Sequence, residues 1–317
     1  MEKEVNCMLN ILSFFSVYIA IFLFGMTILR TGLYNLSRNK MREWLIKLTR
    51  SPWQGMMVGT IITMILQSSS AVMVLTVGLV ATGYLTFHQS IGIILGTNIG
   101  TTFTTELITF RLDEYVVPML IAGAALLLFQ RRVPFCLGSM LFGLGCIFVS
   151  MNGFEKLALP LANLTTIHHI ITQANTNEIL GLGLGTILTA IIQSSTATTG
   201  IIMSFLNENL LTLHAGIAIL FGANIGTCIT ALLASIGANR EAKLTAFTHT
   251  WLNILGVAFF FPFIQTFEGL VSQLTPLPDV QLAHVSLLFN VACSILALPL
   301  TGILANFIMK VHGRHSF

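Results

Sequence analysis

A duplicated pair of polar motifs is the feature that most constrains this chain. The segment GTIITMILQSSSA at residues 59–71 returns 126 residues later as GTILTAIIQSSTA at residues 185–197. At the same offset, GTNIGTTFT at residues 96–104 returns as GANIGTCIT at residues 222–230. One offset shared by two separate motifs indicates that a single ancestral unit was duplicated. Polar clusters repeated inside very apolar sequence are typical of a transport site shared between two halves of a membrane protein.

The composition indicates an all-α polytopic membrane protein. The chain is 55% hydrophobic and only 9% charged, whereas a soluble domain carries about a quarter charged residues. Residues 51–105 contain no Asp, Glu, Lys or Arg, and apolar runs of about 18 residues or more indicate membrane helices. The runs are continuous rather than alternating, which argues against a transmembrane barrel. The net charge of +3 predicts no nucleic-acid partner.

Two apolar hairpins, at residues 52–83 and 178–208, are too short in each arm to cross a bilayer twice. Each arm is about 14 residues, or roughly 21 Å of helix, against a hydrocarbon core of about 30 Å. We therefore expect both hairpins to be re-entrant, with the QSS turn near mid-depth, buried in protein or lining a wet cavity. Residues 152–177 are predicted to form a loop. The remaining apolar runs predict helices at residues 9–34, 88–109, 115–130, 134–151, 213–236, 243–265 and 284–309.

The basic residues predict the orientation. The loop after the first helix is rich in Lys and Arg, which places it in the cytoplasm by the positive-inside rule. With re-entrant hairpins, twelve of the fifteen Lys and Arg residues fall inside, counting Arg30 at the inner end of the first helix. The N-terminus is then outside and the C-terminus in the cytoplasm, in a multi-pass protein of the plasma membrane. Three crossings separate the hairpins, so the first opens from the cytoplasm and the second from outside.

These crossings divide the chain into two inverted-topology repeats. Residues 1–133 form repeat 1, residues 134–265 form repeat 2, and residues 266–317 form an outer loop and a final transmembrane helix, with no soluble domain expected. In each repeat, the glycines of the G-x-N-I-G-T motif predict a broken transmembrane helix. The two hairpin tips should meet near the middle of the bilayer, which suits alternating access. The sequence leaves a homodimer open.

The hairpin tips predict an anion site. Amides and hydroxyls both donate and accept hydrogen bonds, and the arm after each tip begins a half-helix whose free N–H groups attract anions. The candidate substrate-binding residues are Gln67, Ser68, Ser69, Ser70, Gln193, Ser194, Ser195 and Thr196.

The same region predicts a sodium site, because hard cations prefer oxygen ligands. No Arg or Lys is predicted in the core of any span, so we expect the anion and the cation to bind together and offset each other's charge. The candidate sodium ligands are Gln67, Ser69, Asn98, Thr101, Thr102, Gln193, Ser195, Asn224 and Thr227. Glu106 is a candidate gating or ion residue; the alternatives are that it reaches the interface or pairs with Arg111.

Together these motifs resemble the type II sodium–phosphate cotransporter family. The resemblance rests on QSSSA at 67–71, QSSTA at 193–197, NIGTT at 98–102 and NIGT at 224–227, and it covers residues 20–130 and 140–265. It implies cotransport of inorganic phosphate with Na⁺ at the QSS tips, with no resident cofactor. Some bacterial relatives add a C-terminal domain resembling the phosphate-regulon protein PhoU, which we expect to be absent here. The sodium stoichiometry stays open.

Other functions compete with this one. Another oxyanion or a small carboxylate is the main competing substrate, and a channel or a sensor is a further alternative. A serine enzyme needs a base beside its nucleophile, and neither hairpin carries one near its serines, so the chain is predicted not to be an enzyme. The plainest alternative is that Ser and Thr only pack and bond back to their own helices.

Overall fold

The computed structural model describes residues 2–110 and 112–313, and these residues form helices joined by short turns. Within them, five helices are long and apolar enough to cross a membrane. The all-α, polytopic fold class is therefore confirmed. The first part of the chain forms α1 (Glu2–Lys47), α2 (Pro52–Leu66), α3 (Ser69–Ala81), α4 (Phe87–Leu107), α5 (Val116–Leu127), α6 (Arg132–Ala162) and α7 (Thr165–Thr176).

The second part begins with the predicted hairpin, whereas the predicted outer loop from residue 266 contains α13 and the predicted final helix is divided into α14 and α15. It forms α8 (Glu178–Ile192), α9 (Ser195–Asn207), α10 (Leu213–Gly226), α11 (Cys228–Ala234), α12 (Arg240–Phe260), α13 (Ile264–Ser272), α14 (Pro278–Ala297) and α15 (Thr301–His312). The predicted loop at residues 152–177 is wrong, because α6 continues to Ala162 and α7 follows it. The polar residues Glu155 and Lys156 resemble a loop in sequence, yet they lie on one side of a helix whose Phe154 and Ala158 are buried.

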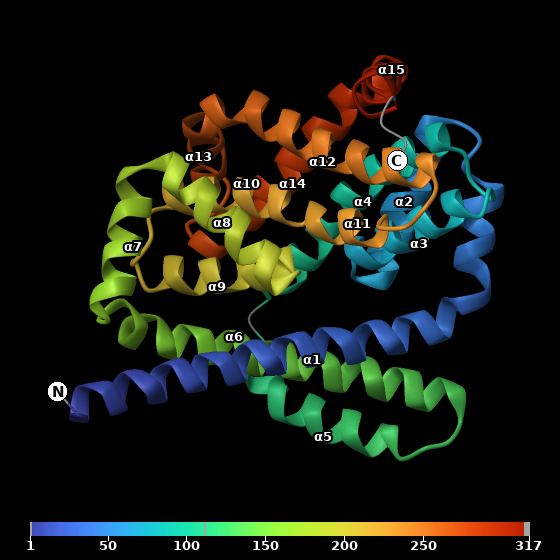
Figure 1. The fold of residues 1–317 in the computed structure, drawn as a ribbon. Helices are drawn as coiled ribbons and strands as arrows, with labels where there is room; N and C mark the ends of the chain where they lie inside the picture. Colours follow the sequence, from blue (N-terminus) through green and yellow to red (C-terminus); the bar gives the residue numbers. More distant parts are fainter. Residues whose placement is uncertain (1, 111, 314–317) are drawn as a thin grey trace.

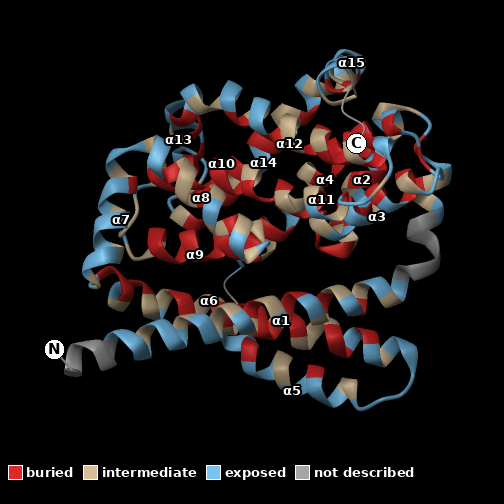
Figure 2. Ribbon diagram, viewed as in Figure 1, coloured by how far each residue is buried: buried red, intermediate tan, exposed pale blue. Residues whose placement is uncertain are grey.

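The helices form two layers (Figure 1). The long helices α1 and α6 run side by side, and α5 packs on α6. The other helices form a bundle on the opposite side of this pair. Buried residues concentrate inside the bundle (Figure 2), where Phe221 and Phe289 approach to 4.5 Å between ring centroids. Large apolar side chains such as Ile121 and Leu128 are exposed on the outer faces, as expected where lipid replaces water.

Each hairpin packs against the helix that follows it, and the two contacts are equivalent. Helix α2 packs on α4, and α8 packs on α10. At Gly96 an added methyl group would collide with the carbonyl oxygen of Met56, and at Gly222 it would collide with that of Leu182. The glycines thus let backbones approach closely. The prediction that they break a helix is wrong for α4, which is continuous; α10 and α11 are separated only at Thr227.

Hydrogen bonds locate the open end of each hairpin. At one end, Gln89 Nε2 at the start of α4 donates to Thr49 O before α2 (3.0 Å), and Asn239 Nδ2 before α12 donates to Ala81 O at the end of α3 (2.9 Å). We call this the basic end; it is defined by Lys47, Arg50, Arg240, Lys243 and Lys310.

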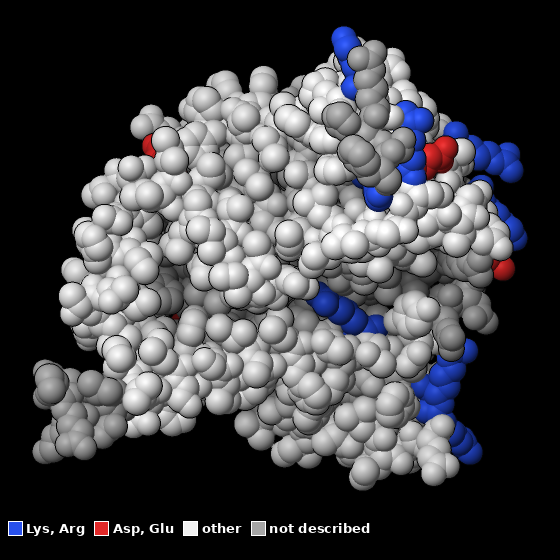
Figure 3. All heavy atoms as spheres, in the orientation of Figure 1, with Lys and Arg blue, Asp and Glu red and all other residues white. Residues whose placement is uncertain are grey.

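The open end of the second hairpin lies at the opposite end of the molecule. His214 at the start of α10 contacts Glu178 at the start of α8, 2.6 Å from Nε2 to Oε1. Asn207 at the end of α9 donates to Asp279 at the start of α14 (3.3 Å). We call this the acidic end; it is defined by Glu106, Glu155, Glu178, Glu268 and Asp279. Helix α4 runs from the basic end to the acidic end, so the two hairpins open at opposite ends of the molecule. Figure 3 shows most of the visible Lys and Arg gathered on one side.

Candidate functional site

The two hairpin tips have the same backbone geometry. Helix α2 ends at Gln67 with φ 51° and ψ 32°, and α8 ends at Gln193 with φ 56° and ψ 28°. A residue other than glycine in this left-handed region costs on the order of 1–3 kcal/mol and persists only where the surroundings enforce it. Retaining glutamine at both positions, where glycine would fit more easily, points to a role for the amide side chain.

The serine after each glutamine starts the next helix. Ser68 Oγ accepts a hydrogen bond from Ala71 N–H (3.1 Å), and Ser194 Oγ accepts one from Ala197 N–H (3.2 Å). Both are N-caps, which satisfy one of the free N–H groups at a helix start. The expected half-helices α3 and α9 therefore begin at the tips, with their positive dipole ends at the QSS turns.

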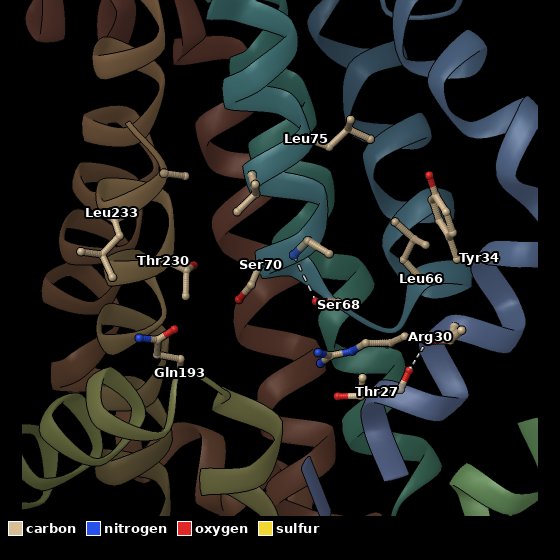
Figure 4. A pocket seen from close by; sticks show the side chains of 14 residues that line it. Thr27, Arg30, Tyr34, Leu66, Ser68, Ser70, Leu75, Gln193, Thr230 and Leu233 are labelled. Atoms are coloured by element: carbon tan, nitrogen blue, oxygen red, sulfur yellow. Dashed lines mark hydrogen bonds between the residues drawn. The ribbon is translucent and has the colours of Figure 1, made fainter. Parts of the chain in front are cut away.

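Residues from both tips line one cavity of about 890 Å³. Ser68 and Ser70 come from the first tip and Gln193 from the second, so the cavity joins the two repeats (Figure 4). The remaining lining comes from α1, from the arms of the first hairpin and from α11. It consists of Thr27, Arg30, Thr31, Tyr34, Leu66, Ala71, Val74, Leu75, Thr230, Leu233 and Ala234.

The other predicted tip residues lie outside this lining. Gln67 is 4% exposed, and its Nε2 donates to Met64 O (2.6 Å) while its Oε1 has no hydrogen-bond partner among the described residues. Ser69 and Thr196 are buried, and Ser194 and Ser195 are half-buried on the far tip.

The predicted sodium ligands of the NIGT segments are also outside the cavity. Asn98 Nδ2 donates to Asn253 Oδ1 (2.8 Å), and Asn224 Nδ2 donates to Leu220 O in its own helix (3.0 Å). The three threonine hydroxyls bond back to their own helices, which is the packing role that these residue types often have. Thr101 donates to Thr97 O, Thr102 to Ile99 O and Thr227 to Ala223 O.

Arg30 is the site residue that the sequence reasoning missed. Its Nε donates to Gln67 O (3.0 Å), and its side chain lines the cavity, so it lies beside the first tip. Arg30 lies within the candidate span Met8–Leu36, so a basic residue is available beside the first tip. Helix α1 continues about 25 Å beyond Arg30 to Lys47. A polar stripe at helical spacing, Thr27–Arg30–Thr31–Tyr34, is the signal that could have revealed it.

Glu106 pairs across two helices. Its Oε1 lies 2.9 Å from His284 Nδ1 on α14, and both side chains are about a quarter to a third exposed, at 26% and 32%. The alternative partner, Arg111, lies outside the described residues. Glu106 is thus placed at the acidic end, away from the cavity lining, in contact with α14.

Comparison with known proteins decides the family. The model of the Na⁺/Pi-cotransporter family matches residues 21–156 and 158–275. The chain belongs to the Na⁺/Pi-cotransporter family. This is a family of transporters, and the inferred resemblance is confirmed. No solved structure matches the chain.

Relatives of this Na⁺/Pi-cotransporter family member include bacterial and animal proteins. It is 43% identical over 293 residues to "Uncharacterized protein YqeW" of Bacillus subtilis, covering 92% of this chain and 95% of that protein. It is 23% identical over 303 residues to "Putative inorganic phosphate export protein YjbB" of Escherichia coli, covering 95% of this chain but only 55% of that protein. With the human "Sodium-dependent phosphate transport protein 2B" it shares 32% identity over 148 residues, 44% of this chain and 21% of that protein.

Proposed function

We propose that this protein is a sodium-coupled secondary transporter of inorganic phosphate that works by alternating access. The observation that carries the proposal is the single cavity lined by Ser68 and Ser70 of one tip and Gln193 of the other. A site built from both repeats is the arrangement in which one half can move against the other around a bound substrate. The family and its named phosphate-transporting members support the substrate.

Phosphate suits the chemistry of the cavity. Its four oxygens accept several hydrogen bonds, and the lining offers hydroxyl, amide and guanidinium donors from Ser70, Gln193 and Arg30. The N-termini of α3 and α9 add positive dipole ends at the two tips. The remaining substrate candidates of the tips, Gln67, Ser69, Ser194, Ser195 and Thr196, are outside this lining and would reach the anion after movement of a tip.

Sodium is the proposed coupling ion, and the first tip has the best-supported oxygen atoms for it. Gln67 Oε1 and Thr63 Oγ1 are buried and have no hydrogen-bond partner among the described residues. Buried oxygens without a donor are costly unless a partner is supplied, and Na⁺ would supply one. The hydroxyls of Ser69, Thr101 and Thr102 keep a lone pair for a cation, as does that of Thr227, so the NIGT segments remain proposed ligands.

The orientation and the direction of the cavity support alternating access. We assign the basic end to the cytoplasm by the positive-inside rule, which puts the N-terminus outside and makes the hairpins re-entrant from opposite faces. The cavity extends from the tips past Tyr34, Leu75 and Leu233 toward the basic end. This is an inward-open arrangement. The contact between Glu106 and His284 holds α4 and α14 together at the opposite, outer end.

Flux into proteoliposomes tests the function. The purified full-length chain should accumulate radiolabelled phosphate when a sodium gradient is imposed and should do so much more slowly when potassium replaces sodium. Sulfate and dicarboxylates should compete poorly. Equal flux without sodium would contradict the coupling, and stronger competition by sulfate or a dicarboxylate would make that anion the substrate. A flux that continues downhill at channel rates, with no accumulation, would contradict a secondary transporter.

A further inference from the structure

Arg30 is a charged side chain without a compensating charge. Among the side chains that the structure describes, none forms an ion pair with Arg30, and its one hydrogen bond runs from Nε to Gln67 O. Arg30 is half-buried, and it is the only charged residue among those that line the cavity.

An unpaired guanidinium in the lining of this cavity needs a hydrogen-bond acceptor. Burying a charge without a partner is costly, and ionisable residues within membrane segments are rare and commonly mark substrate or ion pathways. Because Nε is already bonded to Gln67 O, the two terminal nitrogens, Nη1 and Nη2, keep their donors. In Figure 4 the guanidinium reaches into the space bounded by Ser68, Ser70 and Gln193.

We propose that Arg30 holds the transported oxyanion through both terminal nitrogens, while its Nε bond to Gln67 O fixes the orientation of the guanidinium. The inference rests on the proposed function and identifies Arg30 as the fixed positive charge of the phosphate site. A planar guanidinium matches two oxygens of one tetrahedral oxyanion, a geometry that a lysine ammonium does not offer. Ser70 and Gln193 would then contact the remaining oxygens from the two repeats.

This assignment changes the expected role of sodium. With Arg30 in the cavity, the anion has a counter-charge before any cation binds. Sodium then strengthens phosphate binding and, by linkage, phosphate strengthens sodium binding by the same factor. Phosphate binding without sodium is weaker but measurable. The earlier expectation, in which each ion is poorly held without the other, depended on the absence of a basic residue.

A purely structural role for Arg30 is the competing explanation, and the chain offers a matched control. Arg132 Nε also donates to a backbone oxygen of α1, that of Asn35 (2.9 Å), but Arg132 does not line the cavity. If Arg30 only anchors the tip to α1, Arg30→Gln is tolerated, because a glutamine amide can still donate to Gln67 O. If Arg30 holds the anion, the same change removes its charge and its paired donors.

Equilibrium binding of radiolabelled phosphate to the purified full-length protein separates these roles. We would compare wild type, Arg30→Gln, Arg30→Lys and Arg132→Gln in choline buffer and in saturating sodium. Arg30→Gln should weaken phosphate binding about tenfold to a hundredfold in both buffers. Arg30→Lys should weaken phosphate binding less, because the positive charge remains and only the contact through two nitrogens is lost. Arg132→Gln should stay within about twofold of wild type.

Each other outcome has a definite meaning. Wild-type affinity in a folded Arg30→Gln protein, with affinity lost in Ser70→Ala, would overturn the role of Arg30 and leave the proposed function standing. If Arg30→Gln does not fold, wild-type affinity in Arg30→Lys would overturn the two-nitrogen contact. If wild type binds sulfate or a dicarboxylate but not phosphate, the proposed substrate fails, and the same variants tested with that anion decide the role of Arg30.

Discussion

Gln67 and Gln193 share a left-handed backbone conformation although 126 residues separate them, with φ 51° in one and φ 56° in the other. Each ends one helix of a hairpin and precedes the serine that caps the next. The duplicated QSS sequence is therefore a duplicated local structure. Because the backbone alone would favour glycine at both positions, we expect the amide side chains to serve the proposed transport site.

Replacing Gln67 with glycine should separate stability from transport. Glycine adopts φ 51° without strain, which offsets the lost hydrogen bond from Gln67 Nε2 to Met64 O, so the melting temperature should change little. Sodium-driven phosphate uptake should fall at least about tenfold, the effect of losing one contact to a charged ligand. The measurements are thermal unfolding of the purified protein and uptake into proteoliposomes.

Asn209 provides the control for this substitution. It also has a left-handed backbone, at φ 56°, but it lies in the turn after α9 and not at a tip. Asn209→Gly should relieve the same strain and leave uptake unchanged. Full uptake by Gln67→Gly would show that the amide at the first tip is dispensable.

The serines of the first tip should differ in what they contribute. Ser68→Ala removes the N-cap of α3, which costs about 1 kcal/mol and should lower the melting temperature as well as the affinity for phosphate. Ser70 lines the cavity but caps no helix, so Ser70→Ala should keep the melting temperature and weaken phosphate binding about tenfold. Equal loss of stability in both variants would contradict this division of roles.

The sequence predicted the hairpins closely because their ends carry local signals. Polar caps precede each helix, and the QSS turns interrupt otherwise apolar runs, so the predicted span at residues 52–83 matches α2 and α3 within about two residues. The glycines were misinterpreted because a sequence does not reveal whether a glycine bends its own helix or lets another backbone approach. Gly96 does the second, against Met56 O.

The cavity itself was only partly predictable. Duplication indicated that the two tips meet, and Ser68 and Gln193 do line one cavity. Which tip residues face the cavity depends on how each hairpin helix is rotated about its own axis. Packing against the neighbouring helices sets that rotation. Arg30 was placed at a membrane boundary because a single basic residue near the end of an apolar run usually lies there. Its contact with the first tip depends on how α1 packs against the hairpin, which the sequence does not reveal.

Close packing at Gly222 predicts a sharp stability effect. A methyl group there would meet the Leu182 carbonyl and Thr186 N, so Gly222→Ala should cost about 1–3 kcal/mol and lower the melting temperature clearly. Gly183 in the same hairpin has open space around it, and Gly183→Ala should keep or raise the melting temperature, because alanine favours the helix by about 1 kcal/mol. If both variants melt alike, the close approach of α8 and α10 is not what these glycines serve.

The proposed orientation can be tested by labelling. Lys47 is exposed at the basic end. Leu274 follows α13, the helix that carries Glu268 of the acidic end, and is 66% exposed. In a protein lacking its native cysteines, a membrane-impermeant maleimide should reach Leu274→Cys in intact cells and Lys47→Cys only in inverted vesicles. Labelling of both positions from the same side would rule out the proposed orientation.

The contact between Glu106 and His284 should hold the protein in its inward-open state. It joins α4 to α14 at the acidic end with a distance of 2.9 Å, whereas the cavity extends toward the basic end. In the proposed alternating-access cycle, opening at the acidic end would require these helices to separate there. Losing one hydrogen bond to a charged group is worth about 1.5 kcal/mol or more, which shifts an equilibrium between two states about tenfold.

Cysteine accessibility in the cavity measures this shift. Thr31→Cys, in a protein lacking its native cysteines, should be labelled quickly in inverted vesicles if the basic end is cytoplasmic as proposed, because Thr31 lines the cavity. Adding His284→Gln or Glu106→Gln should slow that labelling by up to about tenfold, and the double variant should slow it no further, since both single changes break the same contact. Glu178→Gln is the control. It disturbs the contact between Glu178 on α8 and His214 on α10, which lies within one repeat, so the labelling rate should stay unchanged. If the double variant instead adds the two single effects, Glu106 and His284 act through different partners, and the contact between them is not the outer gate.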